Sequence, residues 1–521
     1  MKNLVKLLLI LCITLAMSQE AFSQDWEWSI SSAGTVMPTD VTTDESGNVY
    51  VTGYFTDSVN FFGSGFEVGN TYRMGYLAKV DTAGNFTWVR TFGDLSSDDE
   101  GHAVAVDGLG NVYVSGEFRV SAEFGNITLD ESGSNTQGDI FIAKYSPSGD
   151  VLWAERAGWD EQDDVHDMAI DAADNIYITG YSFEGNFGGY YGITLQEDGS
   201  YIAKYSPDGE VIWAQEMDGE ESAGIAVNGT DKLYTTGYFW GTVNFGNDTL
   251  TSDDWVSDIY LVQMDTSGAV QWARGYGGPD WEWGKSVAVD NENNAFIAGD
   301  FESEMILADS NFIANGFSDY YLAKINESGD FQWALSGGGT GANKGESVTV
   351  NSNGNPVITG EYNNLEDVFL AKYDGLNGNI FWSLAASGEV GSSVNGKSIH
   401  AANTGHLYVT GIHTGEAYFG NHTISGDGGM FLARAADSTF ILSTNNLVGY
   451  RDNPVVYPNP ATNRIKINVS QWERSDIYNI NGVKVMSSNQ QSVDLSAIPQ
   501  GVYLIRIYTK KGIIHQKFIK Q

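Results

Sequence analysis

The chain has 521 residues, a formal net charge of -40, 62 glycines and 13% aromatic residues. Its length exceeds that of one ordinary domain, and glycine-rich turns combined with many aromatic residues favour an all-β protein. Residues 24–453 hold 16 basic and 63 acidic side chains, so like-charge repulsion excludes nucleic acids and anionic membrane surfaces as partners.

Residues 1–23 have the pattern of a signal peptide. Lys2 and Lys6 precede an apolar run, Leu7–Met17, and small residues indicate cleavage after Ser23. The single cysteine, Cys12, lies within that run, so the mature chain would contain no disulfide. No later apolar run reaches the roughly 18 residues of a membrane helix. We therefore expect an exported protein whose mature chain has no transmembrane segment.

Two sequence motifs recur along most of the chain. The first, as in Val104–Gly116, starts at Val41, Val104, Met168, Ile225, Val287, Val348 and Ile399. The second, as in Phe141–Trp153, starts at Tyr76, Phe141, Tyr201, Tyr260, Tyr320, Phe369 and Phe431. A repeat of about sixty residues is typical of units that stack side by side or around a ring, since none can bury its faces alone.

Each motif is typical of a β-hairpin. Val104 and Val106 alternate with small residues before the turn Asp107–Asn111, and Val112 and Val114 alternate after it. Glycine and asparagine in such a turn accept a positive φ at low cost. Two hairpins make a four-stranded antiparallel sheet, so seven pairs of motifs predict a seven-bladed β-propeller.

The propeller, predicted to span residues 24–444, must close, because its first and last sheets would otherwise expose unpaired edges. The second motif ends in tryptophan at positions 88, 153, 213, 272, 333 and 382, but the seventh copy lacks this residue. The segment Trp28–Gly34 resembles Trp272–Gly278. We predict that this N-terminal segment supplies the outer strand of the last blade; the alternative is that residues 439–443 form it.

The two faces of the predicted ring differ in their loops. Both hairpin turns of a blade are short and lie on one face. The opposite face, here called the loop face, carries the connections between hairpins and between blades. The connection within a blade is long, as in Glu117–Asp139, and often contains a Phe-Gly-Asn unit, as at Phe124. Long loops on a rigid scaffold often carry function, so we expect the ligand site on the loop face.

A second, smaller domain follows the repeats. Residues 445–454 are typical of a linker, and residues 455–521 are long enough for a small β-sandwich. Its expected strands are Arg464–Val469, Asp476–Tyr478, Lys484–Met486, Gly501–Tyr508 and Ile513–Ile519. From position 454 onward the chain has nine Lys or Arg residues against three Asp or Glu, a charge opposite to that of the propeller.

The repeats resemble the SBBP family of bacterial β-propeller repeats. The resemblance rests on the recurrent patterns Asp-x-x-Gly-Asn-x-Tyr-Val-Thr-Gly and Ala-Lys-x-x-x-x-Gly-x-x-x-Trp. It implies the fold and very little about activity, because propellers host many unrelated functions.

The last domain resembles the type A C-terminal sorting domain of the type IX secretion system. The matching residues are Tyr457, Pro458, Asn459, Pro460, Gly482, Gly501, Tyr503, Lys517 and Lys520. The resemblance implies a Gram-negative bacterium whose type IX machinery carries the protein across the outer membrane. It also implies that the sorting domain is removed and that the cargo is released or attached to the outer face of that membrane.

Acidic side chains gather in the connections between blades in the first half of the ring. Converging carboxylates provide the hard oxygen ligands that Ca²⁺ prefers. The residues of this predicted calcium site are Asp98, Asp99, Glu100, Asp160, Asp163, Asp164, Asp167 and Asp280. None of these segments has EF-hand spacing, and solvated acidic loops without a metal are the competing interpretation. No cofactor other than Ca²⁺ is expected.

Seven aromatic residues lie in or beside the long loops, apart from the tryptophans of the repeat. They are Trp159, Tyr190, Tyr191, Trp240, Trp255, Trp281 and Trp283. Aromatic rings beside carboxylates suit a glycan, which stacks on the ring and donates its hydroxyl hydrogens, and they also suit a surface protein. Packing between blades is the competing explanation.

No catalytic residue is predicted. The chain has no Gly-x-Ser-x-Gly, His-Glu-x-x-His or phosphate-loop motif, and His102 and His166 occupy equivalent positions of the repeat. We therefore expect a secreted or surface-attached propeller that acts as a binding or structural module. The alternative is a carbohydrate-active enzyme, which requires two carboxylates close together in a pocket.

Overall fold

The protein forms two compact units in this computed structural model, Trp26–Asp437 and a C-terminal unit. The predicted signal peptide, the predicted linker and the alternative closing strand at 439–443 lie outside the described residues. No helix of the described residues is long and apolar enough to cross a membrane. The structure describes residues 25–67, 71–130, 138–158, 162–183, 185–187, 193–195, 198–229, 231–253, 255–308, 310–389, 391–426, 428–437, 456–457, 461–467, 472–479, 484–509 and 512–520.

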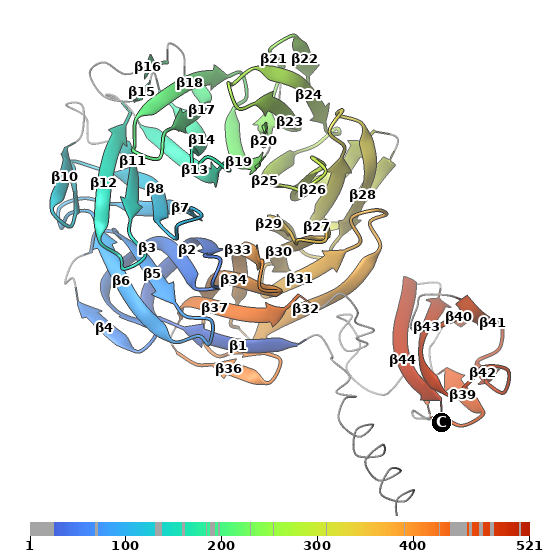
Figure 1. Ribbon diagram of the computed structural model, residues 1–521. Helices are drawn as coiled ribbons and strands as arrows, with labels where there is room; N and C mark the ends of the chain where they lie inside the picture. Colours follow the sequence, from blue (N-terminus) through green and yellow to red (C-terminus); the bar gives the residue numbers. More distant parts are fainter. Residues whose placement is uncertain are drawn as a thin grey trace, which may run out of the picture. The chain divides into compact units, whose positions relative to one another are not determined.

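The described part of the first unit consists of seven blades, each with four antiparallel core strands (Figure 1). The first blade comprises β2 (Ala33–Thr43), β3 (Val49–Phe61), β5 (Met74–Val80) and β6 (Phe86–Phe92), with β4 (Ser64–Glu67) paired to β3. The second comprises β7 (Glu100–Val106), β8 (Val112–Phe118), β11 (Asp139–Tyr145) and β12 (Val151–Ala157). The third comprises β13 (Asp163–Ile170), β14 (Ile176–Ser182), β17 (Gly199–Tyr205) and β18 (Val211–Met217).

The remaining four blades repeat this order. The fourth comprises β19 (Glu221–Asn228), β20 (Lys232–Phe239), β23 (Asp258–Asp265) and β24 (Val270–Tyr276). The fifth comprises β25 (Glu282–Val289), β26 (Ala295–Leu307), β27 (Ser310–Ile325) and β28 (Phe331–Gly337). The sixth comprises β29 (Lys344–Val350), β30 (Pro356–Tyr362), β31 (Asp367–Tyr373) and β32 (Ile380–Gly388). The seventh comprises β33 (Val394–Ala402), β34 (His406–His413), β37 (Gly429–Ala436) and β1 (Trp26–Ser31).

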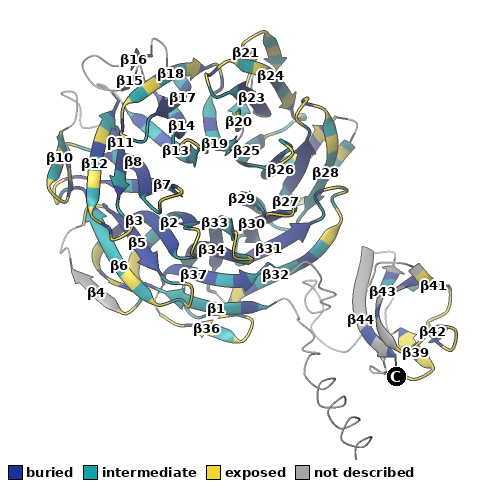
Figure 2. Cartoon of the chain, viewed as in Figure 1, coloured by how far each residue is buried: buried dark blue, intermediate teal, exposed yellow. Residues whose placement is uncertain are grey.

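The blades bury their middle strands and expose their outer strands. The first strand of each blade contacts the first strand of the next, and this chain of contacts runs from β2 through β33 and back to β2. Every residue of β8 is buried except Glu117, whereas the outer strand β12 alternates between more and less exposed positions. Figure 2 shows this gradient, with dark blue concentrated in the middle strands and yellow on the outer ones. The seven-bladed propeller is therefore confirmed.

The N-terminal strand closes the ring. β1 pairs antiparallel with β37, and Trp28 lies opposite Arg434. The carboxylate of Glu27 lies 2.6 Å from Nε of Arg434, which adds an ion pair to the backbone ladder. The prediction that the segment at Trp28 supplies the outer strand of the last blade is confirmed.

The tryptophans of the repeat join neighbouring blades. The indole Nε1–H of Trp153 donates to the carbonyl of Pro207 in the second hairpin turn of the next blade, at 3.2 Å. Equivalent bonds run from Trp28 to Thr82, Trp213 to Thr266, Trp272 to Glu327 and Trp333 to Gly375. Because an indole has one donor and a large apolar body, this residue both packs and links.

The aspartates of the repeat stabilise turns. Oδ1 of Asp107 accepts the backbone N–H groups of Leu109 and Asn111 at 3.0 and 2.8 Å. Its Oδ2 accepts from the Asn111 side chain at 2.8 Å and lies 3.6 Å from Nζ of Lys144. Lys144 also donates to Pro207 of the next blade. These bonds account for the Asp-x-x-Gly-Asn pattern by turn chemistry.

The long connections contain small hairpins that lie against the preceding blade. Phe124 packs its ring 5.4 Å from that of Phe92 in the first blade and 4.8 Å from that of Phe141 in its own. In two cases the hairpin extends the neighbouring sheet, since β15 pairs with β12 and β35 with β32. These hairpin strands are β9 (Ser121–Phe124), β10 (Ile127–Asp130), β15 (Asn186–Phe187), β16 (Ile193–Thr194), β21 (Thr242–Phe245), β22 (Asp248–Thr251), β35 (Ala417–Phe419) and β36 (His422–Ile424).

The C-terminal unit is a pair of sheets around one core. One sheet contains β38 (Val456–Tyr457), β39 (Arg464–Ile467) and β42 (Ser492–Asp494); the other contains β41 (Lys484–Ser488), β40 (Trp472–Asn479), β43 (Gly501–Thr509) and β44 (Gly512–Lys520). Ile465 and Val493 of the first sheet share a core with Ile477 and Ile505 of the second, as a β-sandwich requires. The sequence analysis missed β42, because three residues with one apolar position carry no alternation signal.

Part of the predicted sorting motif lies in this core. The hydroxyl of Tyr503 donates to the carbonyl of Pro499 at 2.8 Å, and the buried ammonium of Lys520 donates to the carbonyl of Leu495 at 2.6 Å. Gly501 pairs with Lys520 and Lys517 with Leu504 between β43 and β44. Tyr457 lies in β38, and Pro458, Asn459, Pro460 and Gly482 lie outside the described residues.

Candidate functional site

Each inner strand carries a β-bulge near its loop-face end. The register shifts by one residue at the same place in all seven described inner strands, as between Gly101 and Ala103 of β7. A bulge inserts one unpaired residue and redirects its side chain. The inserted residues are Thr39, His102, His166, Ala223, Lys285, Glu346 and Lys397.

Four carboxylates surround two of these inserted residues. We call Glu100, Glu117, Asp164 and Glu221 the acidic cluster; they come from β7, β8, β13 and β19. Nε2 of His102 lies 4.0 Å from Glu100 and 3.5 Å from Glu117, and Nδ1 of His166 lies 3.8 Å from Glu221.

Two further side chains complete the cluster. The guanidinium of Arg73 pairs with Glu100 and lies 4.9 Å above the ring of Tyr54. The hydroxyl of Tyr238 donates to Glu221 at 2.7 Å. The cluster therefore draws side chains from blades one to four.

Burial changes the protonation of the cluster. Burial and the neighbouring Asp164 carboxylate raise the pKa of Glu117 to about 9, so this side chain is a neutral acid at pH 7. Burial and the neighbouring His166 lower the pKa of His102 to about 4, so this imidazole is neutral. Glu117 thus holds a proton beside Asp164 and a neutral imidazole, and its side chain is largely buried, with 14% of its surface exposed.

The opposite half of the ring pairs its charges internally. Nζ of Lys285 lies 2.5 Å from Asp300 and 3.2 Å from Glu346, and Nζ of Lys397 lies 2.9 Å from Glu361. Lys285 and its two carboxylates lie in blades five and six. The inserted lysines thus offset the carboxylates of blades five to seven, whereas the acidic cluster has Arg73 as its one ion-paired Lys or Arg among the described residues.

An aromatic pair lies next to the acidic cluster. In the fifth blade Trp283 lies opposite Asp300, and in the fourth blade Glu221 lies opposite Tyr238. Trp283 therefore occupies the position on its inner strand that Glu221 occupies on the neighbouring one. Its ring lies 6.1 Å from that of Trp281 at an interplanar angle of 17°. Trp281 is 40% exposed, and a half-exposed indole offers an apolar face to a ligand.

The other predicted aromatic residues are dispersed. Trp240 is half exposed and its ring lies 6.1 Å from that of Tyr238. Trp255 is 87% exposed. Trp159, Tyr190 and Tyr191 lie outside the described residues.

Most acidic residues predicted to bind calcium are acceptors for protein groups. Asp98 accepts the backbone N–H of Arg73. Asp99 is buried and accepts the N–H groups of Asp94 and Arg119, and burial raises its pKa to about 8.

The third blade follows the same pattern. Asp163 is buried and accepts from the Ser182 hydroxyl. Asp167 accepts the N–H of Ile225 from the next blade, and burial raises its pKa to about 7. Asp160 lies outside the described residues, while Glu100, Asp164 and Asp280 lie near other carboxylates. Across the described ranges, no three His, Cys, Asp or Glu side chains are arranged to hold a metal ion.

Glu117 and Tyr238 were not predicted as site residues from the sequence. Each lies within a strand that the repeat marks as structural. Glu117 and Tyr238 directly follow the repeated glycine of the Thr-Gly or Ser-Gly pair, where the seven copies carry Tyr54, Glu117, Tyr181, Tyr238, Asp300, Glu361 and Ile412. Variation at that one position within a regular repeat is the signal that could have revealed the site.

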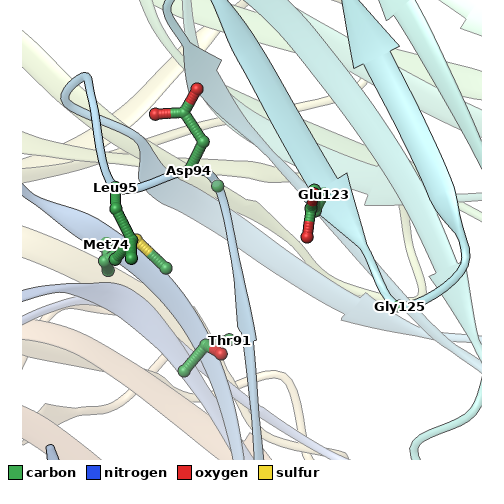
Figure 3. Close-up of a pocket in the computed structure, with 7 residues that line it drawn as sticks. Met74, Thr91, Asp94, Leu95, Glu123 and Gly125 are labelled. Atoms are coloured by element: carbon green, nitrogen blue, oxygen red, sulfur yellow. The ribbon is translucent and has the colours of Figure 1, made fainter. Parts of the chain in front are cut away.

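Two shallow grooves lie away from the acidic cluster, at the outer strands. The larger, about 520 Å³, is lined by Met74, Thr91, Gly93, Asp94, Leu95, Glu123 and Gly125, between β6 and the β9–β10 hairpin (Figure 3). The other, about 290 Å³, lies at the equivalent place between β18 and the β21–β22 hairpin. Their equivalence indicates that the repeat geometry produces them.

Comparisons with known proteins agree with the two resemblances found in the sequence. Residues 455–521 match the family described as a secretion system C-terminal sorting domain, and residues 87–117 match the family described as a beta-propeller repeat, SBBP. Both identifications are confirmed, and together they make this a secreted propeller protein.

One relative and two solved structures are also similar to this chain. An uncharacterised WD repeat-containing protein of Acanthamoeba polyphaga mimivirus is 26% identical over 350 residues, or 54% of this chain; the chain thus spans 25% of that relative's length. The Pan2 WD40 domain of Neurospora crassa is 7% identical with a TM-score of 0.44, covering 81% of this chain and 98% of that domain. The Dos1 propeller is 8% identical with a TM-score of 0.37, covering 80% of this chain and 95% of that one.

Proposed function

We propose that this protein, which carries SBBP-type propeller repeats and a C-terminal sorting domain, is exported by a type IX secretion system and binds an extracellular glycan at its loop face. The sorting domain supports export to the outer face of the outer membrane. The observation that carries the glycan proposal is the nearly parallel pair of the exposed Trp281 and the partly buried Trp283 beside the acidic cluster. An indole face stacks on the C–H face of a sugar ring, while carboxylates accept its hydroxyl hydrogens.

The negative charge of the site limits which glycans it can bind. Glu221 and Asp164 carry negative charge next to the aromatic pair, and the propeller as a whole is strongly acidic. Sulfated or uronate-rich polysaccharides would be repelled, because like charges across an interface oppose association. The site therefore suits a neutral glycan or one with free amino groups, whose ammonium could pair with the cluster.

A glycan array probed with the purified protein tests this proposal. We expect binding to neutral or amino-bearing glycans, and we expect Trp281→Ala to weaken it about tenfold or more, since loss of a stacked ring removes roughly 1–2 kcal/mol. Leu109→Ala is the control, because that exposed side chain lies in a hairpin turn on the opposite face of the ring and its loss should leave affinity unchanged. Binding confined to acidic glycans, or binding indifferent to Trp281→Ala, would contradict the proposal.

A glycan-cleaving enzyme is the second candidate, and the protonated Glu117 favours it. A raised pKa lets a carboxylic acid donate a proton at neutral pH, and a second carboxylate, Asp164, lies beside it. Two neighbouring carboxylates are part of what such an enzyme requires, and they support this second candidate; the grooves lined by described residues lie elsewhere. The same glycans, incubated with the protein, decide between the two: turnover that disappears in Glu117→Gln would establish an enzyme.

A further inference from the structure

A buried and a partly buried carboxylate lie together between the fourth and fifth blades. Asp258 begins β23 and Glu282 begins β25. Glu282 is fully buried, and its backbone N–H donates to the carbonyl of Ser257 at 3.0 Å. The Oε2 atom of Glu282 accepts the N–H of Gly278 at 3.2 Å. Within the described part of the chain, neither Oε1 of Glu282 nor Oδ1 of Asp258 has a hydrogen-bond partner, although both atoms are buried.

The same position in the next blade shows how such a pair is ordinarily satisfied. The backbone N–H of Asn343 donates to Ser318 just as Glu282 donates to Ser257, so Asn343 is the counterpart of Glu282 and Asp319 that of Asp258. There the second side chain is an amide, and its Nδ2 donates to Asp319 at 3.2 Å. The neutral donor leaves no carboxylate oxygen facing another.

Between the second and third blades the pair is again two carboxylates, Asp139 and Asp163. Protein groups surround them: Nε of Arg156 lies 4.0 Å from Asp139, and the hydroxyl of Ser182 donates to Asp163. At the Asp258–Glu282 pair the neighbouring charged groups that act on it are instead further carboxylates, Asp253 and Asp280. Of the three pairs compared, Asp258–Glu282 is therefore the one to which no side chain of the described residues donates a hydrogen bond or brings a positive charge.

Both oxygens lie tightly against glycine backbone, where a side chain would displace them. A Cβ atom added to Gly277 would lie 2.0 Å from Oδ1 of Asp258, and one added to Gly278 would lie 2.9 Å from Oε1 of Glu282. The backbone carbonyl of Glu304 lies against the same Gly278 position, at 2.1 Å. Two adjacent glycines thus let two carboxylate oxygens and a carbonyl oxygen approach the same stretch of backbone, and these are the ligand types of a hard divalent cation.

We propose that Asp258 and Glu282 bind a divalent cation of the Ca²⁺ class between the fourth and fifth blades, with backbone carbonyls and water completing its coordination. The cation neutralises the two facing carboxylates and links the ends of β23 and β25. This site is distinct from the inter-blade acids predicted from the sequence, although one of those, Asp280, contributes to its negative field.

The test is the melting temperature of the full chain, stripped with a chelator and then titrated with CaCl₂ at pH 8. A cation that binds the folded protein raises its stability by mass action, and saturation should raise the Tm by about 4 °C. Glu282→Gln should abolish this rise. It should not lower the Tm in the absence of Ca²⁺, because the new amide can donate to Asp258 as Asn343 donates to Asp319.

A second probe reports occupancy directly. Tb³⁺ replaces Ca²⁺ at oxygen sites and emits when a nearby indole is excited, and Trp281 and Trp283 flank Glu282 in the sequence. We expect sensitised emission that Ca²⁺ displaces and that both Glu282→Gln and Asp258→Asn remove. Asp319→Asn, at the interface that already has an amide, is the control and should leave emission unchanged.

Two results would overturn the inference. If millimolar Ca²⁺ leaves the Tm of the chelator-stripped protein unchanged at pH 8, the two carboxylates hold no cation. If the Tm rise and the Tb³⁺ emission persist in Glu282→Gln and Asp258→Asn, the cation binds elsewhere on the acidic surface.

Discussion

At the scale of single residues, the conspicuous positions of the repeat are structural. Trp213 donates its indole N–H to Thr266 in the next blade at 3.2 Å, and Asp107 accepts the N–H groups of its own turn. Trp382 occupies the same place in the sixth blade, yet its buried Nε1 has no hydrogen-bond partner within the described residues. Comparing Trp213 with Trp382 therefore isolates the contribution of the inter-blade hydrogen bond.

The difference between these two tryptophans leads to a prediction about stability. Trp213→Phe removes a donor from an inter-blade bond and should lower the free energy of unfolding by about 1 kcal/mol more than the loss of ring volume alone. Trp382→Phe removes a buried N–H that has no partner among the described residues, so the same loss of volume should be partly offset by the lost desolvation cost. Denaturant melts of both variants should rank Trp213→Phe as the more damaging. The reverse order would show that the inter-blade bond contributes little.

At the scale of secondary-structure elements, the ring depends on one non-local strand. β1 pairs with β37 across about four hundred positions of sequence, and Trp26 donates to Ala385 of the neighbouring blade at 3.3 Å. Without β1 the seventh blade would have three strands and an exposed edge at β37. Exposed hydrophobic edges pair with other chains, so closure also protects against aggregation.

Deletion of residues 25–31 tests this closure. We expect the Tm to fall by roughly 10 °C or more and soluble oligomers to form, because a buried ladder and the packing of Trp26 are lost together. Differential scanning calorimetry and light scattering measure both effects. Alanine substitutions at the exposed turn residues Ser46 and Ser148 serve as controls, because they leave the pairing of the strands unchanged. A truncated protein that stays monomeric and melts at the parent temperature would mean that another segment closes the ring.

At the scale of the whole molecule, buried carboxyl groups set the response to pH. Burial raises the pKa of Asp99 to about 8, of Asp167 to about 7 and of Glu117 to about 9. The folded state therefore holds protons that the unfolded chain releases near pH 4, so these groups stabilise the fold at low pH and lose that contribution as pH rises through their folded pKa values.

We predict that the propeller is more stable at pH 5 than at pH 9. Each such group costs up to about 1.4 kcal/mol of unfolding free energy per pH unit within its window, and the acidic surface adds self-repulsion in the same direction. His102 opposes the trend at the acidic end, since its lowered pKa of about 4 makes the folded state resist protonation below pH 6.5. Thermal melts in chelator across this range measure the slope, and Glu117→Gln should flatten it between pH 5 and pH 9. A Tm that rises with pH would contradict the prediction.

Local chemistry explains why so much of the architecture follows from sequence. Turns such as Asp107–Asn111 and the alternation of Val112 and Val114 act over a few residues, so each hairpin is determined by its own local sequence. Seven copies of the pattern then set the number of blades. The closing strand at Trp28 was recognisable because its sequence repeats that of another outer strand. The sorting domain was recognisable for the same reason, by the residues that resemble its family.

The site was decided by tertiary structure. Glu117 and Asp164 are 47 positions apart in the sequence and meet because one blade lies beside the next. The pair Asp258–Glu282 likewise forms across a blade interface. No local pattern encodes such distances: they depend on the bulge in each inner strand and on the curvature that seven blades impose when the ring closes. The sequence alone determined the fold and the face on which to look, and the closed ring determined which carboxylates share a site and which of them keep their protons.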